Sequence, residues 1–382
     1  MTVDRPPMGW NSWNTFGPGV NEKLIKETCD LMVSSGLRDA GYEYVVIDDL
    51  WSLKERDPET GRLVPDPSKF PGGMKTLSDY VHSKGMKLGI YSCAGTMTCG
   101  SQPGSYEYEF TDARCFAEWG IDFLKYDYCY KPAFEWGELL YRRMGLALAN
   151  SGRDILFSAC SWGDDGTSSW INTTGAHMWR STHDLLDSWE LLKKRISEQL
   201  KMLSSGGQNC FNDMDMLIAG MNGKGHVGVC ACTPVQYRTH FAFWALCGAP
   251  LFIGCDISAC GDETLNLLKN AVLISINQDR ACCRPFTIGG FRNCRTGTDE
   301  QRFVLARFLD NGDIAVGMFN LSDERCRMFF HLSELGLSRV CGVKLTMTDC
   351  FSGQELSSGC GQFVQDIGAG DCRVYRCRIA QE

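Results

Sequence analysis

The chain has no long apolar run and no excess of positive charge. None of its apolar stretches approaches the roughly 20 residues that a helix needs to cross a bilayer, so we expect no membrane partner. Its 38 Lys and Arg residues against 46 Asp and Glu residues give a net charge of −8. No basic stripe is available to replace phosphate counterions, so we expect no nucleic-acid partner either.

Histidine is scarce, with six residues, and none falls in a ligand-like pair with the nearby carboxylates. We therefore expect neither a metal nor another cofactor.

Residues 1–5 lack the apolar core of a secretory signal, which favours a cytoplasmic location. A secreted protein is the alternative, because the chain has 21 cysteines. The cysteines lack the regular spacing of a disulfide scaffold. The sequence leaves the oligomeric state open, and a homo-oligomer is one of the alternatives.

The composition is that of an ordinary globular protein, with 44% hydrophobic and 22% charged residues in a chain of 382. This length suits a barrel of roughly 250–300 residues followed by a smaller domain.

Eight short apolar runs predict the strands of that barrel. They are centred on residues 8–10, 44–47, 87–91, 123–126, 155–159, 177–179, 210–211 and 250–254. The stretches between them, such as 21–35 and 188–204, carry apolar residues at helical spacing. Alternation of strand and helix indicates a parallel sheet, and eight repeats predict a (β/α)8 TIM barrel.

The pattern changes after Asn277-Gln278-Asp279. Residues 302–307, 313–319, 343–347 and 372–376 are typical of strands separated by turns, and no long helix intervenes. We predict a barrel domain over residues 1–284 and a C-terminal antiparallel β-sandwich over residues 285–382.

Polar residues gather where the apolar runs end. They are Asp48 and Asp49, Tyr91, Lys125 and Asp127, Ser161, Arg180 and Asp184, Asp213 and Asp215, and Asp256. A barrel builds its active site from the carboxyl ends of its strands. Several strands donating carboxylates to one rim therefore indicate catalysis.

Several motifs in order resemble glycoside hydrolase family 27, the α-galactosidases and α-N-acetylgalactosaminidases. They are Met8-Gly9-Trp10-Asn11-Ser12-Trp13, Asp48-Asp49-Leu50-Trp51, Gly89-Ile90-Tyr91, Lys125-Tyr126-Asp127-Tyr128-Cys129, Trp179-Arg180-Ser181-Thr182-His183-Asp184, Asn212-Asp213-Met214-Asp215-Met216-Leu217, Ala249-Pro250-Leu251 and Asn277-Gln278-Asp279. The resemblance covers residues 8 to about 285, and the sandwich follows where the family places one.

The resemblance implies a retaining exo-acting glycosidase with Asp127 as nucleophile and Asp184 as acid/base. It implies sugar contacts from Trp13, Asp48, Asp49, Tyr91, Cys99, Lys125, Ser161, Arg180 and Asp215. It also implies a disulfide between Cys99 and Cys129. The substrate is then an α-galactoside or an α-N-acetylgalactosaminide.

These residue types suit glycosidic cleavage, in which one carboxylate attacks the anomeric carbon and the other protonates the leaving oxygen. Asp127 must be ionised, and Lys125, two residues away on the same face of its strand, is placed to favour that form. Asp184 must hold a proton, so we expect less stabilisation of its charged form by nearby cations than for Asp127.

Two alternatives to an α-galactosidase remain at this point. Ser161 stands where galactosidases of the family usually carry an acidic or amide residue, and serine leaves room for an N-acetyl group. An α-N-acetylgalactosaminidase is therefore the second hypothesis. A non-catalytic sugar-binding protein on a decayed barrel is the third, and the presence of both Asp127 and Asp184 weighs against it.

Three local features complete the sequence analysis. The family usually has a cysteine at the position of Leu50, paired to one near Pro18, so that disulfide is absent here. His183 replaces a small residue before Asp184, and we expect it to shape the pocket mouth. Residues 223–228 match G-x-G-x-x-G but follow no strand, so we interpret them as a rim loop and not as a dinucleotide site.

Overall fold

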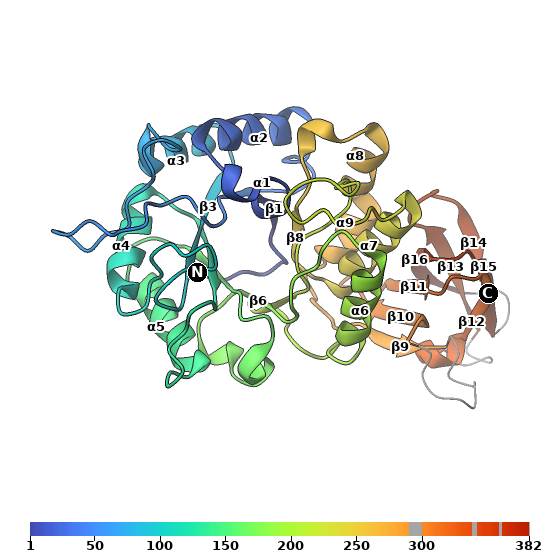
Figure 1. The fold of residues 1–382 in the computed structure, drawn as a ribbon. Coiled ribbons are helices and arrows are strands. Elements are labelled where there is room, and N and C mark those ends of the chain that lie inside the picture. The colour runs from blue at the N-terminus through green and yellow to red at the C-terminus, as the bar shows by residue number, and fades with distance from the viewer. Residues whose placement is uncertain (290–299, 338–341, 359–360, 382) are drawn as a thin grey trace.

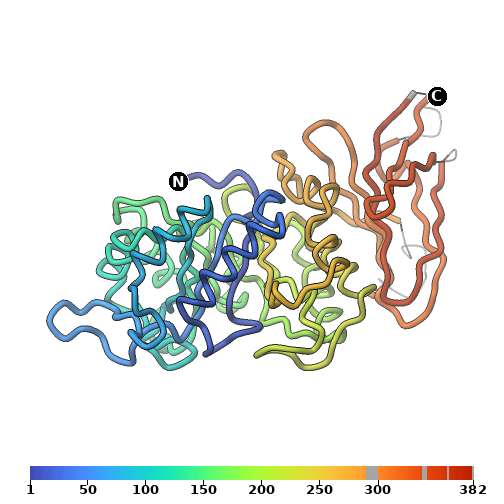
Figure 2. Tube along the Cα trace, turned by 90° about the horizontal axis from the view of Figure 1, so that it is seen from above, coloured from blue at the N-terminus to red at the C-terminus, as the bar shows by residue number. Residues whose placement is uncertain are grey.

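The computed structural model describes residues 1–289, 300–337, 342–358 and 361–381. A barrel domain and a C-terminal β domain lie side by side, and the chain ends on the side of the β domain that is remote from the barrel (Figures 1 and 2). Within the described ranges, no helix is both long and apolar enough to cross a membrane.

Eight parallel strands form the barrel. They are β1 (Met8–Asn11), β2 (Tyr44–Val46), β3 (Lys87–Cys93), β4 (Phe123–Asp127), β5 (Leu156–Ala159), β6 (Met178–Arg180), β7 (Phe211–Asp213) and β8 (Leu251–Ile253). From β1 to β7 each strand pairs with the next along the chain, and β8 pairs with β1. The segment after β7 closes the ring, because Leu217 donates its N–H to Phe252 and accepts from Gly254. The predicted (β/α)8 barrel is confirmed.

Helices follow the strands on the outside of the ring. They are α1 (Trp13–Phe16), α2 (Glu22–Ser34), α3 (Gly73–Ser83), α4 (Glu109–Trp119), α5 (Gly137–Ala149), α6 (Trp189–Leu200), α7 (Pro234–Cys247), α8 (Asp262–Leu268) and α9 (Ala271–Asn277). Helix α2 begins where the Asn21 side chain accepts the N–H of Leu24. It buries Ile25, Cys29 and Met32, the helical spacing that predicted it.

The C-terminal domain is antiparallel, as predicted. Its strands are β9 (Phe286–Ile288), β10 (Arg302–Phe308), β11 (Ile314–Asn320), β12 (Cys326–His331), β13 (Val343–Asp349), β14 (Glu355–Ser357), β15 (Gln362–Ile367) and β16 (Asp371–Gln381). Six of them form one sheet in the order β14-β13-β16-β11-β10-β9, and β12 pairs with β15 in the other. The sequence pattern missed β9, β12, β14 and β15. The exact division at residues 284/285 stays a prediction.

Strands β10 and β11 of the large sheet are buried on both faces, which ties the two domains together. Along β10, Val304 and Ala306 pack into the sandwich core, while Phe303 and Leu305 belong to the apolar core that the barrel shares. Phe243 of α7 lies edge-on to Phe303, with ring centroids 5.9 Å apart. Helix α7 of the barrel domain thus packs on the sandwich as a third layer.

A lysine connects the two segments whose family disulfide is absent. Lys69 Nζ donates to the backbone carbonyl of Pro18 at 2.9 Å and to that of Leu50 at 2.6 Å. An ammonium with two carbonyl acceptors therefore joins the loops after α1 and β2, and Leu50 follows the site residue Asp49 directly.

Candidate active site

A narrow pocket of about 60 Å³ opens at the carboxyl ends of the barrel strands. Its lining includes all the predicted site residues except Ser161, and their roles stay predictions. The lining residues are Trp13, Asn14, Asp48, Asp49, Tyr91, Cys99, Lys125, Asp127, Trp162, Arg180, Asp184, Leu185, Leu186, Asp215, Met216 and Val227.

Asp127 ends β4 and is 6% exposed. The Tyr91 hydroxyl donates to its Oδ2 at 2.9 Å, and the N–H of Tyr128 donates to its Oδ1 at 2.9 Å. Burial raises the pKa of Asp127 from an ordinary value of 3.8 to about 6, although Lys125 and the Tyr91 hydrogen bond oppose the rise. The carboxylate is therefore held in a fixed orientation but is costly to ionise.

Lys125 contacts a different carboxylate from the one expected. Its Nζ donates to Asp48 Oδ2 at 2.8 Å, and Asn11 Nδ2 donates to the same oxygen at 2.7 Å. The Asp48 side chain is 2% exposed and that of Lys125 is 13% exposed. Burial alone lowers the pKa of Lys125, but the Asp48 carboxylate outweighs it and the net pKa is raised. Lys125 is thus a permanent cation that acts on Asp127 only from a distance.

Asp49 is the second buried carboxylate on this side of the pocket. Its Oδ2 accepts the N–H of Gly100 at 2.6 Å, and its Oδ1 accepts the N–H of Leu50 at 2.7 Å. Burial raises its pKa despite these two hydrogen bonds. The Asp49 carboxylate thereby connects the loop after β2 to the loop that carries Cys99.

Arg180 holds two carboxylates on the other side of the pocket. Its Nη2 donates to Asp184 Oδ1 at 2.9 Å and lies 3.1 Å from Asp215 Oδ2. Arg180 and Asp215 are each 4% exposed, whereas the Asp184 side chain is 63% exposed. Asp215 is anchored further because its two oxygens accept the N–H groups of Leu185 and Met216.

The two proposed catalytic carboxyls have pKa values shifted in the opposite sense to their expected roles. Burial raises the pKa of Asp184, but Arg180 and Lys125 outweigh it and the net pKa is lowered. The pKa of Asp127 is raised instead. The physical reason is pairing, because Lys125 contacts Asp48 and Arg180 contacts Asp184. In the free pocket the shared proton therefore favours Asp127.

Ser161 is the expected site residue that the structure does not place in the pocket. It is fully buried, and its hydroxyl lies 2.7 Å from that of Thr167 in the 3-10 turn at Asp164–Ser169. Trp162 lines the pocket in its place. Trp162 has φ +58°, a strained conformation that recurs at functional sites. The predicted role of Ser161 beside the sugar stays a prediction, and Trp162 is the neighbouring residue that lines the pocket.

The loop matched by G-x-G-x-x-G lies at the rim, as expected. Val227 lines the pocket, and His226 packs edge-on against Trp13 with ring centroids 4.8 Å apart. Trp13 is therefore positioned by a segment more than 200 residues away in sequence. Six lining residues were not predicted as site residues: Asn14, Trp162, Leu185, Leu186, Met216 and Val227. The sequence does not show which residues of a rim segment face the pocket.

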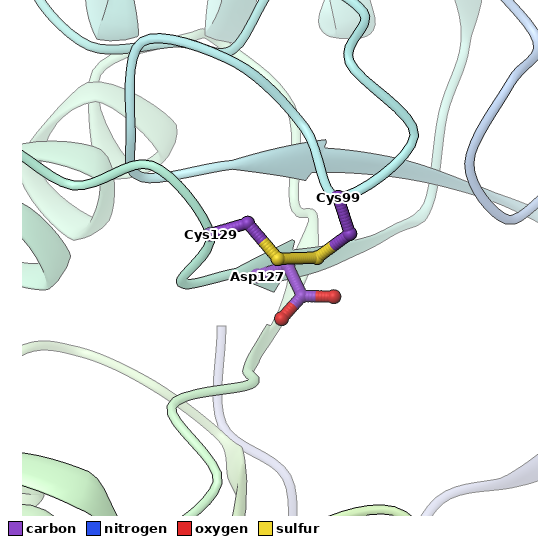
Figure 3. Close-up of side chains that lie close together, drawn as sticks. All are labelled: Cys99, Asp127 and Cys129. Carbon is purple, nitrogen blue, oxygen red and sulfur yellow. A yellow bond between two sulfur atoms is a disulfide. The ribbon is translucent and has the colours of Figure 1, made fainter.

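A disulfide joins Cys99 and Cys129 beside Asp127, with Cα atoms 5.2 Å apart (Figure 3). It ties the loop after β3 to the end of β4. Within the described ranges, these two sulfurs and the Asp127 carboxylate form the one group whose atoms have metal-ligand spacing. Sulfurs bonded to each other offer no thiolate to a metal, so we interpret this disulfide as a covalent link that holds the loop after β3 beside Asp127.

Comparisons with known proteins give one consistent result. A family model described as "Alpha galactosidase A" matches residues 5–279, and one described as "Alpha galactosidase C-terminal beta sandwich domain" matches residues 299–377. An alpha-galactosidase from Coffea arabica is 41% identical over 371 residues, covering 97% of this chain and 93% of the relative.

Two solved structures extend the similarity to three dimensions. Alpha-galactosidase I from Mortierella vinacea matches with a TM-score of 0.86 at 30% identity, covering 98% of this chain and 97% of that one. The alpha-galactosidase from Saccharomyces cerevisiae, solved with raffinose, matches with a TM-score of 0.88 at 26% identity, covering 99% and 98%.

Proposed function

Because this chain belongs to the α-galactosidase family of glycoside hydrolases, we propose that it removes terminal α-linked galactosyl units with retention of anomeric configuration. One observation carries the proposal: Asp127 and Asp184 line a single pocket in a chain that matches the family over both domains. The name of the Coffea arabica relative supports the same substrate class.

The proposed reaction has two steps. In the first, an Asp127 oxygen bonds to the anomeric carbon, the glycosidic bond breaks, and its electrons stay on the leaving oxygen, which takes a proton from Asp184. In the second, a water oxygen bonds to the anomeric carbon while Asp184 accepts the proton from that water. The bond to Asp127 breaks, and α-galactose leaves.

Arg180 must change its pairing for the first step to occur. Its contact with Asp184 disfavours the proton that this carboxyl has to deliver. Since the Arg180 guanidinium already lies 3.1 Å from Asp215, we propose that the entering sugar shifts it fully onto Asp215. Asp184 is then buried by the substrate without a cation in contact, and both changes raise its pKa.

The α-N-acetylgalactosaminide alternative depends on Ser161, whose role stays a prediction. Ser161 is buried, with its hydroxyl 2.7 Å from that of Thr167. The Coffea arabica relative is named an alpha-galactosidase. We therefore propose an α-galactoside as the substrate, and the N-acetyl sugar becomes an outcome of the test.

The test is turnover of p-nitrophenyl α-galactoside and of its N-acetyl analogue, assayed in parallel and followed by NMR. We expect hydrolysis of the galactoside, with the α-anomer as the first product, since two inversions restore the configuration. A first product in the β-anomer would contradict the nucleophile assignment. Faster turnover of the N-acetyl analogue would contradict the substrate, and no turnover of either would contradict the enzyme.

The pH dependence follows from the two shifted carboxyls. With the pKa of Asp127 at about 6 and that of Asp184 lowered, the pair carries one proton below about pH 6. In this singly protonated pair, a small fraction of molecules has the proton on Asp184, the arrangement that reacts. This fraction does not change with pH. As pH rises through about 6 the proton is lost, so kcat/KM on an α-galactoside should fall about tenfold per pH unit above this value. A rise in kcat/KM between pH 5 and 7 would contradict the assignment.

The cytoplasmic location stays a prediction. The Cys99–Cys129 disulfide allows a test of this prediction. Thiol alkylation before lysis, followed by mass spectrometry, shows whether this pair is oxidised in the cell.

A further inference from the structure

Two large aromatic side chains are exposed in one loop near the pocket. Phe134 is 78% exposed and Trp136 is 73% exposed. Both lie in the loop from β4, the strand that ends at Asp127, to the start of α5. This loop is on the face of a barrel where substrates bind. Because leaving such side chains in water forgoes the free energy of burying them, neighbouring exposed aromatics mark a binding surface.

These two rings line a cavity of about 690 Å³, which we call the aromatic groove. Its lining residues are Ala133, Phe134, Glu135, Trp136, Gly137, Glu138, Asp165, Ser169, Trp170 and Thr173. The Trp170 ring is held in place, because its Nε1 donates to the Asp165 carbonyl at 2.9 Å and its face stacks on Tyr141. The groove thus combines at least one fixed aromatic platform with carboxylates and hydroxyls.

A short segment connects the groove to the pocket. Trp162 lines the pocket, and the His183 ring stacks on it with centroids 6.2 Å apart. The Asp164 carboxylate lies 3.4 Å from His183 Nε2. The next residue, Asp165, lines the groove and lies 3.4 Å from Lys131. One turn of chain therefore carries both the pocket wall and the groove wall.

The lining chemistry favours a neutral sugar chain over other occupants. Sugar rings have apolar faces that stack on aromatic rings, and hydroxyl edges that bond to carboxylates. Among the lining residues that the structure describes, there is no lysine or arginine. Each lining carboxylate pairs with a cation just outside the lining: Asp165 with Lys131, Glu135 with Arg143 and Glu138 with Arg142. The groove is therefore close to neutral, which suits an uncharged ligand better than a strongly anionic one.

We propose that the aromatic groove binds the aglycone of an α-galactosyl oligosaccharide whose terminal galactosyl unit occupies the pocket. This inference depends on the proposed function and narrows it: the natural substrate has several sugar units, and Phe134 and Trp136 recognise those beyond the cleaved bond.

The experiment compares wild type with the double variant Phe134→Ala/Trp136→Ala. The substrates are p-nitrophenyl α-galactoside, raffinose and manno-oligosaccharides of increasing length that carry one α-galactosyl branch. We expect kcat/KM of the wild type to rise with aglycone length, and the double variant to lose about tenfold or more on the longest substrate. Its kcat/KM on the aryl galactoside should stay within about twofold, since that aglycone is too short to reach the groove.

Phe110→Ala is the matched control, because Phe110 is 53% exposed on α4 and does not line the groove. It should change neither activity. Equal loss on all substrates, or no loss on any, overturns the inference while leaving the proposed function intact. A change of oligomeric state in the double variant with unchanged kcat/KM on all substrates overturns it too, because the groove is then an interface between copies. No turnover of aryl galactoside by wild type refutes the proposed function and this inference with it.

Discussion

Replacing Asp127 with asparagine should lower kcat by about 10⁴-fold or more on every α-galactoside, with no recovery on substrates that have good leaving groups. An amide keeps the size and the hydrogen bond from Tyr91, but it cannot form the bond to the anomeric carbon. The measurement is kcat on raffinose and on p-nitrophenyl α-galactoside, with binding of galactose checked by calorimetry.

Asp184→Ala should behave differently on the same two substrates. The sugar leaving group of raffinose must be protonated as it departs, so kcat should fall by about 10²–10⁴-fold. The p-nitrophenolate anion leaves without a proton, so formation of the covalent intermediate should lose much less. Equal losses on both substrates for Asp184→Ala would remove it as the acid. Unequal losses for Asp127→Asn would remove Asp127 as the nucleophile.

Lys125→Met should be strongly destabilising, by about 3–5 kcal/mol in the free energy of unfolding. The substitution leaves the Asp48 carboxylate, whose side chain is 2% exposed, without its cation at 2.8 Å. Asn11 remains as a donor, but one neutral hydrogen bond does not offset the cost of a buried charge. Urea unfolding of the two proteins at neutral pH measures the difference.

A double variant separates charge from packing. Lys125→Met/Asp48→Asn has no buried charge at this position and should recover most of the lost free energy. Lys87→Met is the matched control, since the Lys87 side chain is 45% exposed and paired with Glu43 at the surface. Its cost should be about 0–1 kcal/mol. If both single lysine variants lose the same amount, the pair of Lys125 and Asp48 is not the buried ion pair described here.

Local patterns predicted the barrel because each strand and helix has its own period of apolar residues. Helix α2 follows from a capping asparagine and apolar positions three and four apart, and eight such repeats leave few topologies other than a closed parallel sheet. Strands β12 and β14 were missed. Many of their residues are exposed or half-buried, which weakens the alternation of apolar and polar residues that predicts a strand.

Most of the pocket lining could be predicted because each carboxylate or cation lies in the last residues of a strand or within a few residues after it, and parallel strands end at one rim. What the sequence could not determine is which charges pair. Lys125 is two residues from Asp127 on one strand, yet it contacts Asp48 from a strand two places away. The pKa values of Asp127 and Asp184 depend on these pairings, and so the sequence-based assignment of the proton was reversed.

By itself, then, the amino-acid sequence determined the family, the barrel and the residues that reach its rim, since these depend on local periodicity and on ordered motifs. Only the tertiary structure decided that Ser161 is buried behind Trp162, that Arg180 is shared by Asp184 and Asp215, and that exposed rings line a groove beside the pocket. The physical reason is that burial and pairing depend on distances across the barrel between side chains from different strands, and spacing along the chain does not encode them.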